Sequence, residues 1–218
     1  MTDPLDSARS CIQHAQKRIH ELAADIHAYE ASKPYEEVWE IDKASCDRLH
    51  KVVVRQLPPR ALGHIAFDAM NNLRAALDQA GYAVAYVANP GASSKYGNFP
   101  FGENLSEVQS RRTSNNGNSR DIPESIFDVI VGYRPFKAGN YELWALNKLC
   151  NSNKHQTMVF PFIKPMSATI LRGVISGATF GLTNGANPYE YILQRVRPGG
   201  YSTAEIKFDF QIKLGNEQ

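Results

Sequence analysis

The fold of this chain is decided by residues 60–87, RALGHIAFDAMNNLRAALDQAGYAVAYV. Apolar side chains recur at every third or fourth position along this stretch, from Leu62 to Val84. This is the 3.6-residue period of a helix that buries one side. Pro58 and Pro59 precede it, and proline suits the start of a helix because the first turn needs no amide donors. The sequence therefore predicts one long central helix.

The segment before this helix predicts another helix and then a β-hairpin. Residues 6–29 carry apolar side chains at helical spacing behind residues that suit an N-cap, and Pro34 ends the pattern. Residues 38–41 and 49–57 are rich in β-branched side chains, and the second run alternates. We therefore expect two short strands joined by a turn at residues 42–47.

The segment after the long helix predicts loops and two short helices. Residues 89–97 are rich in glycine and serine, and residues 103–122 have the polar composition of a mobile loop. The basic ends of the second loop would suit an acidic partner, and a solvated surface loop is the simpler explanation. Apolar periodicity returns in residues 123–131 and 139–153, which predict short helices.

The C-terminal third changes from helical to strand patterns. Its segments rich in β-branched and aromatic residues, each bounded by Gly, Asn or Pro, are 158–163, 168–175, 189–196 and 204–214. Helices in one part of a chain and strands in another are typical of an α+β fold. We expect a helical N-terminal two-thirds with a short hairpin, and an antiparallel, β-rich C-terminal third.

The expected domain organisation follows from this segregation. Residues 1–156 would form a helical region with the hairpin, at about 35–57, inserted in it. Residues 157–218 would form a β-rich region packed on it.

Composition excludes some classes of protein. The 218 residues are 43% hydrophobic and 21% charged, which is ordinary for a globular protein, and the net charge of +2 does not by itself indicate a nucleic-acid binder. No apolar run is long enough to span a membrane, and the N-terminus has no signal-peptide pattern. The three cysteines match no metal-ligand spacing. We expect a cytoplasmic protein without cofactor, metal or membrane partner.

Residues 146–156, LNKLCNSNKHQ, place unusual polar groups beside an apolar helix face. Asn147, Asn151, Lys154 and His155 recur at about helical spacing. Asparagine is a poor helix former and is costly to bury, so the cluster needs a partner. One hypothesis is an asparagine ladder that fixes two helices in register. The other is an active site in which His155 is the acid or base and Lys154 stabilises an anion.

A second candidate group lies on one face of the long helix. Asn71, Arg74 and Asp78 fall together there because they are three or four residues apart. A surface salt bridge between Arg74 and Asp78 is the simpler explanation. If a helix or a second protomer covers this face, Arg74 is able to hold a carboxylate or a phosphate through two hydrogen bonds.

These two segments resemble the motifs of an uncharacterised bacterial family. Residues 70–79, MNNLRAALDQ, resemble its Asn-Leu-Arg-Ser-Ala-Leu-Asp-His motif, and residues 146–156 resemble its Leu-x-x-Leu-x-Asn-x-Asp-Lys-His-Arg motif. The family's Phe-Pro-Ile and Gln-Pro-Tyr elements resemble residues 98–101 and 133–136. The resemblance covers roughly residues 8–160 and implies an architecture and candidate positions, without an activity. Gln79, Asn153 and Gln156 stand where the family has His, Asp and Arg, which removes three ionisable groups.

The helical region is also similar to HEPN domains, whose ribonuclease members carry Arg-x4–6-His on a helix at a dimer interface. Arg9 and His14 fit that pattern, and Arg74 with His155 is an alternative pair. Metal-independent RNA cleavage needs a base for the 2′-hydroxyl and a cation for the phosphorane. We therefore hypothesise an RNA-cleaving or RNA-binding protein of the toxin or defence class, and the HEPN analogy implies a homodimer. Arg74 and His155 would be catalytic, and the substrate would be bound by Asn71, Asp78, Asn147, Asn151 and Lys154.

The competing hypothesis is a non-enzymatic binding or assembly module. In it, the same polar residues only join helices or protomers, and the partner is a protein or a second copy. An open cleft holding Arg74 and His155 would favour the nuclease, whereas buried groups with paired hydrogen bonds would favour the module.

Overall fold

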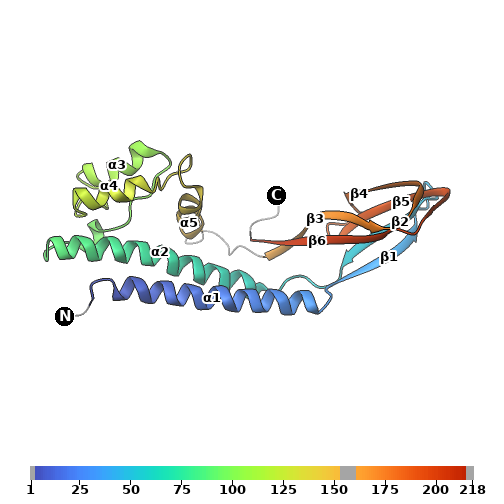
Figure 1. Cartoon of the computed structure of the whole chain (residues 1–218), viewed down its shortest axis with the longest axis horizontal. Coiled ribbons are helices and arrows are strands. Elements are labelled where there is room, and N and C mark those ends of the chain that lie inside the picture. The colour runs from blue at the N-terminus through green and yellow to red at the C-terminus, as the bar shows by residue number, and fades with distance from the viewer. Residues whose placement is uncertain (1–2, 153–160, 215–218) are drawn as a thin grey trace. The chain divides into compact units, whose positions relative to one another are not determined.

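The computed structural model describes residues 3–152 and 161–214 (Figure 1). Its helical elements are α1 (Asp6–Ala31), α2 (Arg60–Ala88), the 3-10 turn η1 (Ser94–Tyr96), α3 (Leu105–Thr113), α4 (Glu124–Gly132) and α5 (Tyr141–Ser152). Its strands are β1 (Tyr35–Ile41), β2 (Arg48–Val54), β3 (Pro161–Arg172), β4 (Ile175–Asn184), β5 (Glu190–Ser202) and β6 (Glu205–Leu214). This confirms the predicted α+β class. None of the helices in the described ranges is both long and apolar enough to cross a membrane.

The chain consists of two compact units. The helical unit comprises Met1–Ala23 and His64–Met158, and the sheet unit comprises Ala24–Gly63 and Val159–Gln218. These boundaries differ from the expected division between residues 156 and 157, because α1 and α2 each supply residues to both units. The hairpin of β1 and β2 belongs to the sheet unit, since β2 pairs with the C-terminal strand β5.

The long helix α2 follows its predicted apolar stripe in its first half, where Leu62 and Ala66 are buried. In its second half small residues are buried as well, among them Gly81. A Cβ atom on Gly81 would lie 2.4 Å from the carbonyl oxygen of Gly97. Glycine at this position therefore allows the loop after η1 to cross α2 closely.

Phenylalanines dominate the core of the helical unit. Its buried cluster consists of Phe99, Phe101, Ile122, Phe127 and Ile130, with Leu77, Val131 and Leu143 packed against it. The centroids of the Phe99 and Phe101 rings are 4.8 Å apart, so the Phe-Pro-Phe segment 99–101 is part of this core. The cluster joins α2, α4 and α5, and thereby fixes the helices that carry the candidate site residues.

The polar segment 103–122 contains a helix, α3, where its composition predicted a loop. Asn104 caps this helix by accepting a hydrogen bond from the Glu107 amide, and the Glu107 carboxylate accepts one from the Glu103 amide, both at 2.9 Å. The Glu107 carboxylate thus binds the amide of the residue before the N-cap, one position earlier than in a capping box. Val108 is fully buried. The Asn-x-x-Glu spacing was visible in the sequence, and the polar composition around it concealed the helix.

The sheet unit contains two antiparallel sheets, of order β1-β2-β5-β4 and β3-β6. The predicted hairpin is confirmed, and β5 and β6 contain the predicted strands at 189–196 and 204–214 except for the first residue of each. Most of the predicted strand at 168–175 lies within β3. The strand β4 was not predicted, because glycines such as Gly177, with φ of 62°, interrupt its alternating pattern.

One row of side chains crosses the four-stranded sheet. It consists of the cross-strand partners Trp39, His50, Gln194 and Phe180. The Trp39 and His50 rings stack with centroids 4.5 Å apart, and His50 Nε2 lies 2.9 Å from Glu37 Oε2. His50 Nδ1 and both polar atoms of the Gln194 side chain are buried without a hydrogen-bond partner within the described part of the chain. This row therefore contains a polar pair that destabilises the sheet.

Tyr29 makes the stability of the sheet unit depend on pH. Its ring packs against Val54 and Tyr191 in the core, and its hydroxyl donates to the Gln56 carbonyl oxygen at 2.6 Å. Burial raises the pKa of Tyr29 from 10.0 to about 12. The unfolded chain therefore loses the phenol proton at a lower pH than the folded chain. We expect Tyr29 to contribute about 2 kcal/mol to the free energy of unfolding of the sheet unit. This contribution is fully present below pH 10 and is lost as the pH rises through 12.

The measurement uses the two tryptophans, of which Trp39 lies in the sheet unit and Trp144 in the helical unit. In a Trp144→Phe background, denaturant titrations followed by Trp39 fluorescence report the sheet unit between about pH 9 and 12. A Tyr29→Phe variant should be less stable at neutral pH and lose this part of the pH dependence. If the free energy of unfolding depends on pH with the same slope in the wild type and in Tyr29→Phe, the prediction is contradicted.

Candidate functional site

The two polar motifs singled out in the sequence meet in the structure. Arg74 Nε on α2 donates a hydrogen bond to Asn147 Oδ1 on α5 at 3.2 Å, and Asn151 Nδ2 donates to the same oxygen at 3.1 Å. Arg74 and Asn147 are 73 positions apart in the chain. The motifs therefore form one group, the Arg74 cluster, which consists of Arg74, Asp78, Asn147 and Asn151.

Asp78 connects this cluster to the phenylalanine core. Its Oδ2 forms an ion pair with Arg74 Nη1, and its Oδ1 accepts a hydrogen bond from the Phe99 amide at 3.0 Å. The guanidinium carbon of Arg74 lies 4.3 Å from the centroid of the Phe101 ring, a distance at which the cation is attracted by the ring face. Through these contacts the cluster ties α2 to the Phe-Pro-Phe segment and to α5.

The Arg74–Asp78 pair is partly withdrawn from water. The two side chains are 18% and 29% exposed. Charges in such a position depend on each other, because removing one leaves the other desolvated without a counter-charge. Nη1 contacts the Asp78 carboxylate as an ion pair but is buried without a hydrogen-bond partner, and Nη2 forms neither a hydrogen bond nor an ion pair with a described residue. The cluster thus has the contacts of a structural element, with hydrogen-bonding capacity left on the two Nη atoms.

The remaining candidates of the two motifs are placed as follows. Asn71 is half-buried on α2, and its side chain makes no hydrogen bond with a described residue. Lys154 and His155 lie outside the described residues, so the predicted pair of Arg74 and His155 stays a prediction.

The alternative HEPN-like pair lies on α1. Arg9 and His14 are both exposed, and Arg9 forms an ion pair with Asp3. The guanidinium of Arg9 is therefore directed to a carboxylate in its own segment.

A second group, which the sequence motifs did not indicate, surrounds the Trp144 ring. We call it the Trp144 surface, and it consists of Lys137, Tyr141, Trp144 and Lys148. The Nζ atoms of Lys137 and Lys148 lie 5.3 and 5.9 Å from the centroid of the Trp144 ring. The Tyr141 ring is 5.3 Å away, centroid to centroid, and is 62% exposed as a residue. Aromatic faces and ammonium groups therefore alternate over a short distance.

Glu103 holds this surface in place. It accepts a hydrogen bond from Trp144 Nε1 at 3.0 Å, and its other oxygen lies 2.5 Å from Lys148 Nζ. The hydrogen bond from Lys148 is the main reason why the pKa of Glu103 is lowered, so this side chain is a carboxylate at neutral pH. The signal in the sequence was the spacing of positions 141, 144 and 148, which puts two aromatic residues and a lysine on one face of α5, and Lys137 lies in the segment before this helix.

Comparison of the chain with protein-family models, with curated proteins and with solved structures finds no match.

Proposed function

We propose that this chain is a cytoplasmic RNA-binding module that does not cut RNA, and that single-stranded RNA binds at the Trp144 surface. The observation that carries the proposal is the placement of two lysine ammonium groups within 6 Å of an aromatic ring beside the exposed Tyr141 ring. Proteins that bind single strands combine cations for the phosphates with rings on which bases stack.

The geometry fits a single strand better than a duplex. A base needs an accessible ring face, which Tyr141 offers, and each stacked base contributes about 1–3 kcal/mol. Lys137 and Lys148 flank the rings and would contact the neighbouring phosphates. Glu103 fixes Trp144 and Lys148 in advance, which reduces the entropy lost on binding. Recognition of this kind tolerates many base sequences.

The contacts of the Arg74 cluster support binding without cleavage. A nuclease arginine must be free to stabilise the phosphorane in the transition state. In Arg74, Nη1 forms an ion pair with Asp78, Nε donates a hydrogen bond to Asn147, and the guanidinium lies against the Phe101 ring. A phosphate held through two hydrogen bonds would have to displace at least one of these contacts, whereas a structural role uses all of them.

The test is fluorescence anisotropy with a labelled, mixed-sequence RNA of about 12 nucleotides. Tyr141→Ala should weaken binding about tenfold, because an exposed stacking platform is lost without disturbing the core. Lys137→Ala should weaken binding. It should also reduce the slope of log affinity against log salt concentration, between about 50 and 200 mM, by the amount expected for about one phosphate contact. Tyr201→Ala is the matched control and should bind normally, because Tyr201 is an exposed tyrosine in the sheet unit.

The same RNA incubated with and without EDTA and run on a gel tests cleavage. We expect intact RNA at every time point. Metal-independent cutting that His155→Ala and Arg74→Ala both abolish would instead establish the nuclease. Absence of RNA binding in the wild-type protein would overturn the proposal and favour an assembly module.

A further inference from the structure

The turn between α4 and α5 is fixed beside the candidate RNA surface. Pro135 and Phe136 in its middle are buried. The carbonyl oxygen of Arg134 accepts hydrogen bonds from the amides of Phe136 and Asn140, both at 2.7 Å, so the turn closes onto the residue before α5. The Gly102 amide donates to the Pro135 carbonyl oxygen at 3.3 Å. The turn is thus held against the start of α5 and against the segment that leads into α3.

This turn adds a second exposed ring and a further cation to the surface. Tyr133 is 63% exposed, about as much as Tyr141, and the exposed Arg134 follows it directly. Tyr133 precedes Arg134 and Tyr141 follows Asn140, and Arg134 and Asn140 are joined by a hydrogen bond. Two exposed tyrosines therefore flank one closed turn. Successive bases of a single strand stack on rings placed in this way.

Arg134 differs from the other arginines of the helical unit because it has no carboxylate partner. The others each form an ion pair, and they are Arg9, Arg18, Arg74, Arg111, Arg112 and Arg120. Arg134 forms no ion pair with a described residue, and its Nη2 donates to the Ala138 carbonyl oxygen at 3.3 Å. Its guanidinium is therefore able to bind a phosphate without first leaving a carboxylate.

The backbone at Arg134 also indicates a use for its side chain. Its φ is 54°, a left-handed conformation that suits glycine or asparagine better than arginine. The next residue is Pro135, which disfavours helical conformations of the residue before it. Glycine at position 134 would avoid part of this strain. An arginine that costs backbone strain and pairs with no carboxylate is typical of a residue that contacts a ligand.

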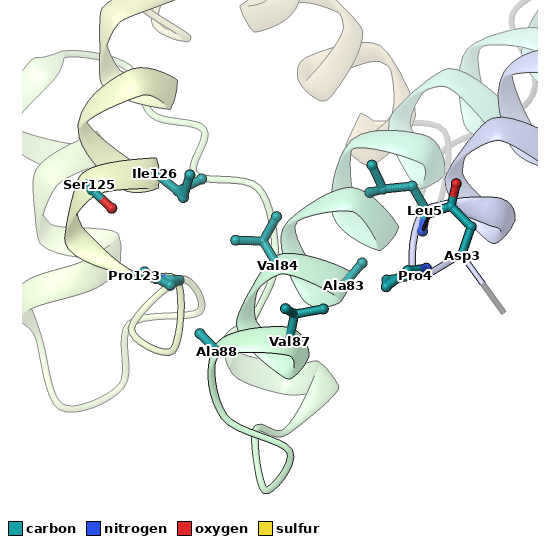
Figure 2. A pocket seen from close by; sticks show the side chains of 10 residues that line it. All are labelled: Asp3, Pro4, Leu5, Ala83, Val84, Val87, Ala88, Pro123, Ser125 and Ile126. Atoms are coloured by element: carbon teal, nitrogen blue, oxygen red, sulfur yellow. Dashed lines mark hydrogen bonds between the residues drawn. The ribbon is translucent and has the colours of Figure 1, made fainter. Parts of the chain in front are cut away.

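The apolar groove at the other end of α4 offers RNA no comparable contacts. It has a volume of about 410 Å³ and opens between the segment before α1, the last turns of α2 and the start of α4 (Figure 2). Its lining is apolar except for Asp3 and Ser125, and it includes no cation. Phosphates have no partner there. A strand that leaves the Trp144 surface is therefore expected to follow the basic turn at the end of α4.

We infer that single-stranded RNA continues from the Trp144 surface onto this turn, with a base on the Tyr133 ring and a phosphate on Arg134. The inference rests on the proposed function, because it extends the same binding site. Tyr133 and Tyr141 stack two bases of one strand, and Arg134 and Lys137 neutralise phosphates beside them. The RNA site is then a track along the surface rather than a contact for one nucleotide.

The test measures binding of the labelled RNA of about 12 nucleotides to the full chain. Arg134→Gly should weaken binding about fivefold at about 50 mM salt. It should also reduce the slope of log affinity against log salt concentration by about 0.7, the value for one phosphate of a single strand. The melting temperature should stay unchanged or rise, because glycine adopts the left-handed conformation without strain. A residue with a merely structural role would lose stability instead.

Tyr133→Ala should weaken binding about tenfold. Tyr86→Ala and Arg9→Ala are the matched controls, because they remove an exposed tyrosine and an exposed arginine elsewhere in the helical unit, and both should bind as the wild type does. Normal binding by Arg134→Gly and Tyr133→Ala, with weakened binding by Tyr141→Ala, would overturn this inference alone. An equal loss in Arg9→Ala would also overturn it, since net charge would then explain the effect. Absence of binding in the wild type would overturn the proposed function as well.

Discussion

Replacement of Arg74 by alanine should destabilise the helical unit by about 2–4 kcal/mol. The substitution removes the ion pair with Asp78, the hydrogen bond to Asn147 and the contact with the Phe101 ring. It also leaves the half-buried Asp78 carboxylate without its counter-charge. This second effect is the larger one, because a desolvated charge without a partner costs more than the lost contacts.

The measurement is a denaturant titration followed by Trp144 fluorescence in a Trp39→Phe background, in which the helical unit holds the only tryptophan. Arg74→Lys keeps the positive charge but loses the planar guanidinium with its several donors. It should therefore lower the free energy of unfolding by about half as much as Arg74→Ala. Arg18→Ala is the control, because Arg18 pairs with Glu21 on the surface and should hardly affect the midpoint. An unchanged midpoint in Arg74→Ala would show that the cluster is not structural and would revive the nuclease hypothesis.

Replacement of Gln194 by methionine should stabilise the sheet unit by about 1–3 kcal/mol. Gln194 is 1% exposed, and neither Nε2 nor Oε1 has a hydrogen-bond partner within the described ranges. Methionine has nearly the same length and shape and brings no polar group that needs a partner. The gain is thus the desolvation cost of an unpaired amide, which the wild-type protein carries at the centre of its larger sheet.

Trp39 fluorescence in the Trp144→Phe background measures this effect. Gln56→Met is the matched control, since Gln56 is exposed and the same substitution there should change stability little. A loss of stability in Gln194→Met would mean that the carboxamide is satisfied in solution, by water or by a ligand. The sheet would then contain a polar site rather than an unpaired amide.

The elements of the helical unit were largely predictable, and their meeting points were not. The helices α1, α2, α4 and α5 follow apolar repeats that each segment carries by itself. The sequence also singled out Arg74 and Asn147, because polar groups beside an apolar face need partners. Arg74 and Asn147 become partners only because α2 and α5 pack around the phenylalanine core.

Local composition misled the prediction in two places. Polar residues concealed the N-cap of α3, and glycines concealed β4. The Trp144 surface was missed for a related reason, since Lys137 precedes the helix and Glu103 comes from another segment.

The sequence by itself determined the α+β class, most of the helices, the hairpin and the identity of the polar groups that need partners. A helix or a hairpin is encoded within a few residues, because its hydrogen bonds join neighbours in the chain. Only the tertiary structure decided that β2 pairs with β5, that Arg74 is shared by Asp78, Asn147 and Phe101, and that an apolar groove opens between α2 and α4. These contacts join residues far apart in the chain, and their energies depend on the packing of the whole unit, which no local pattern records.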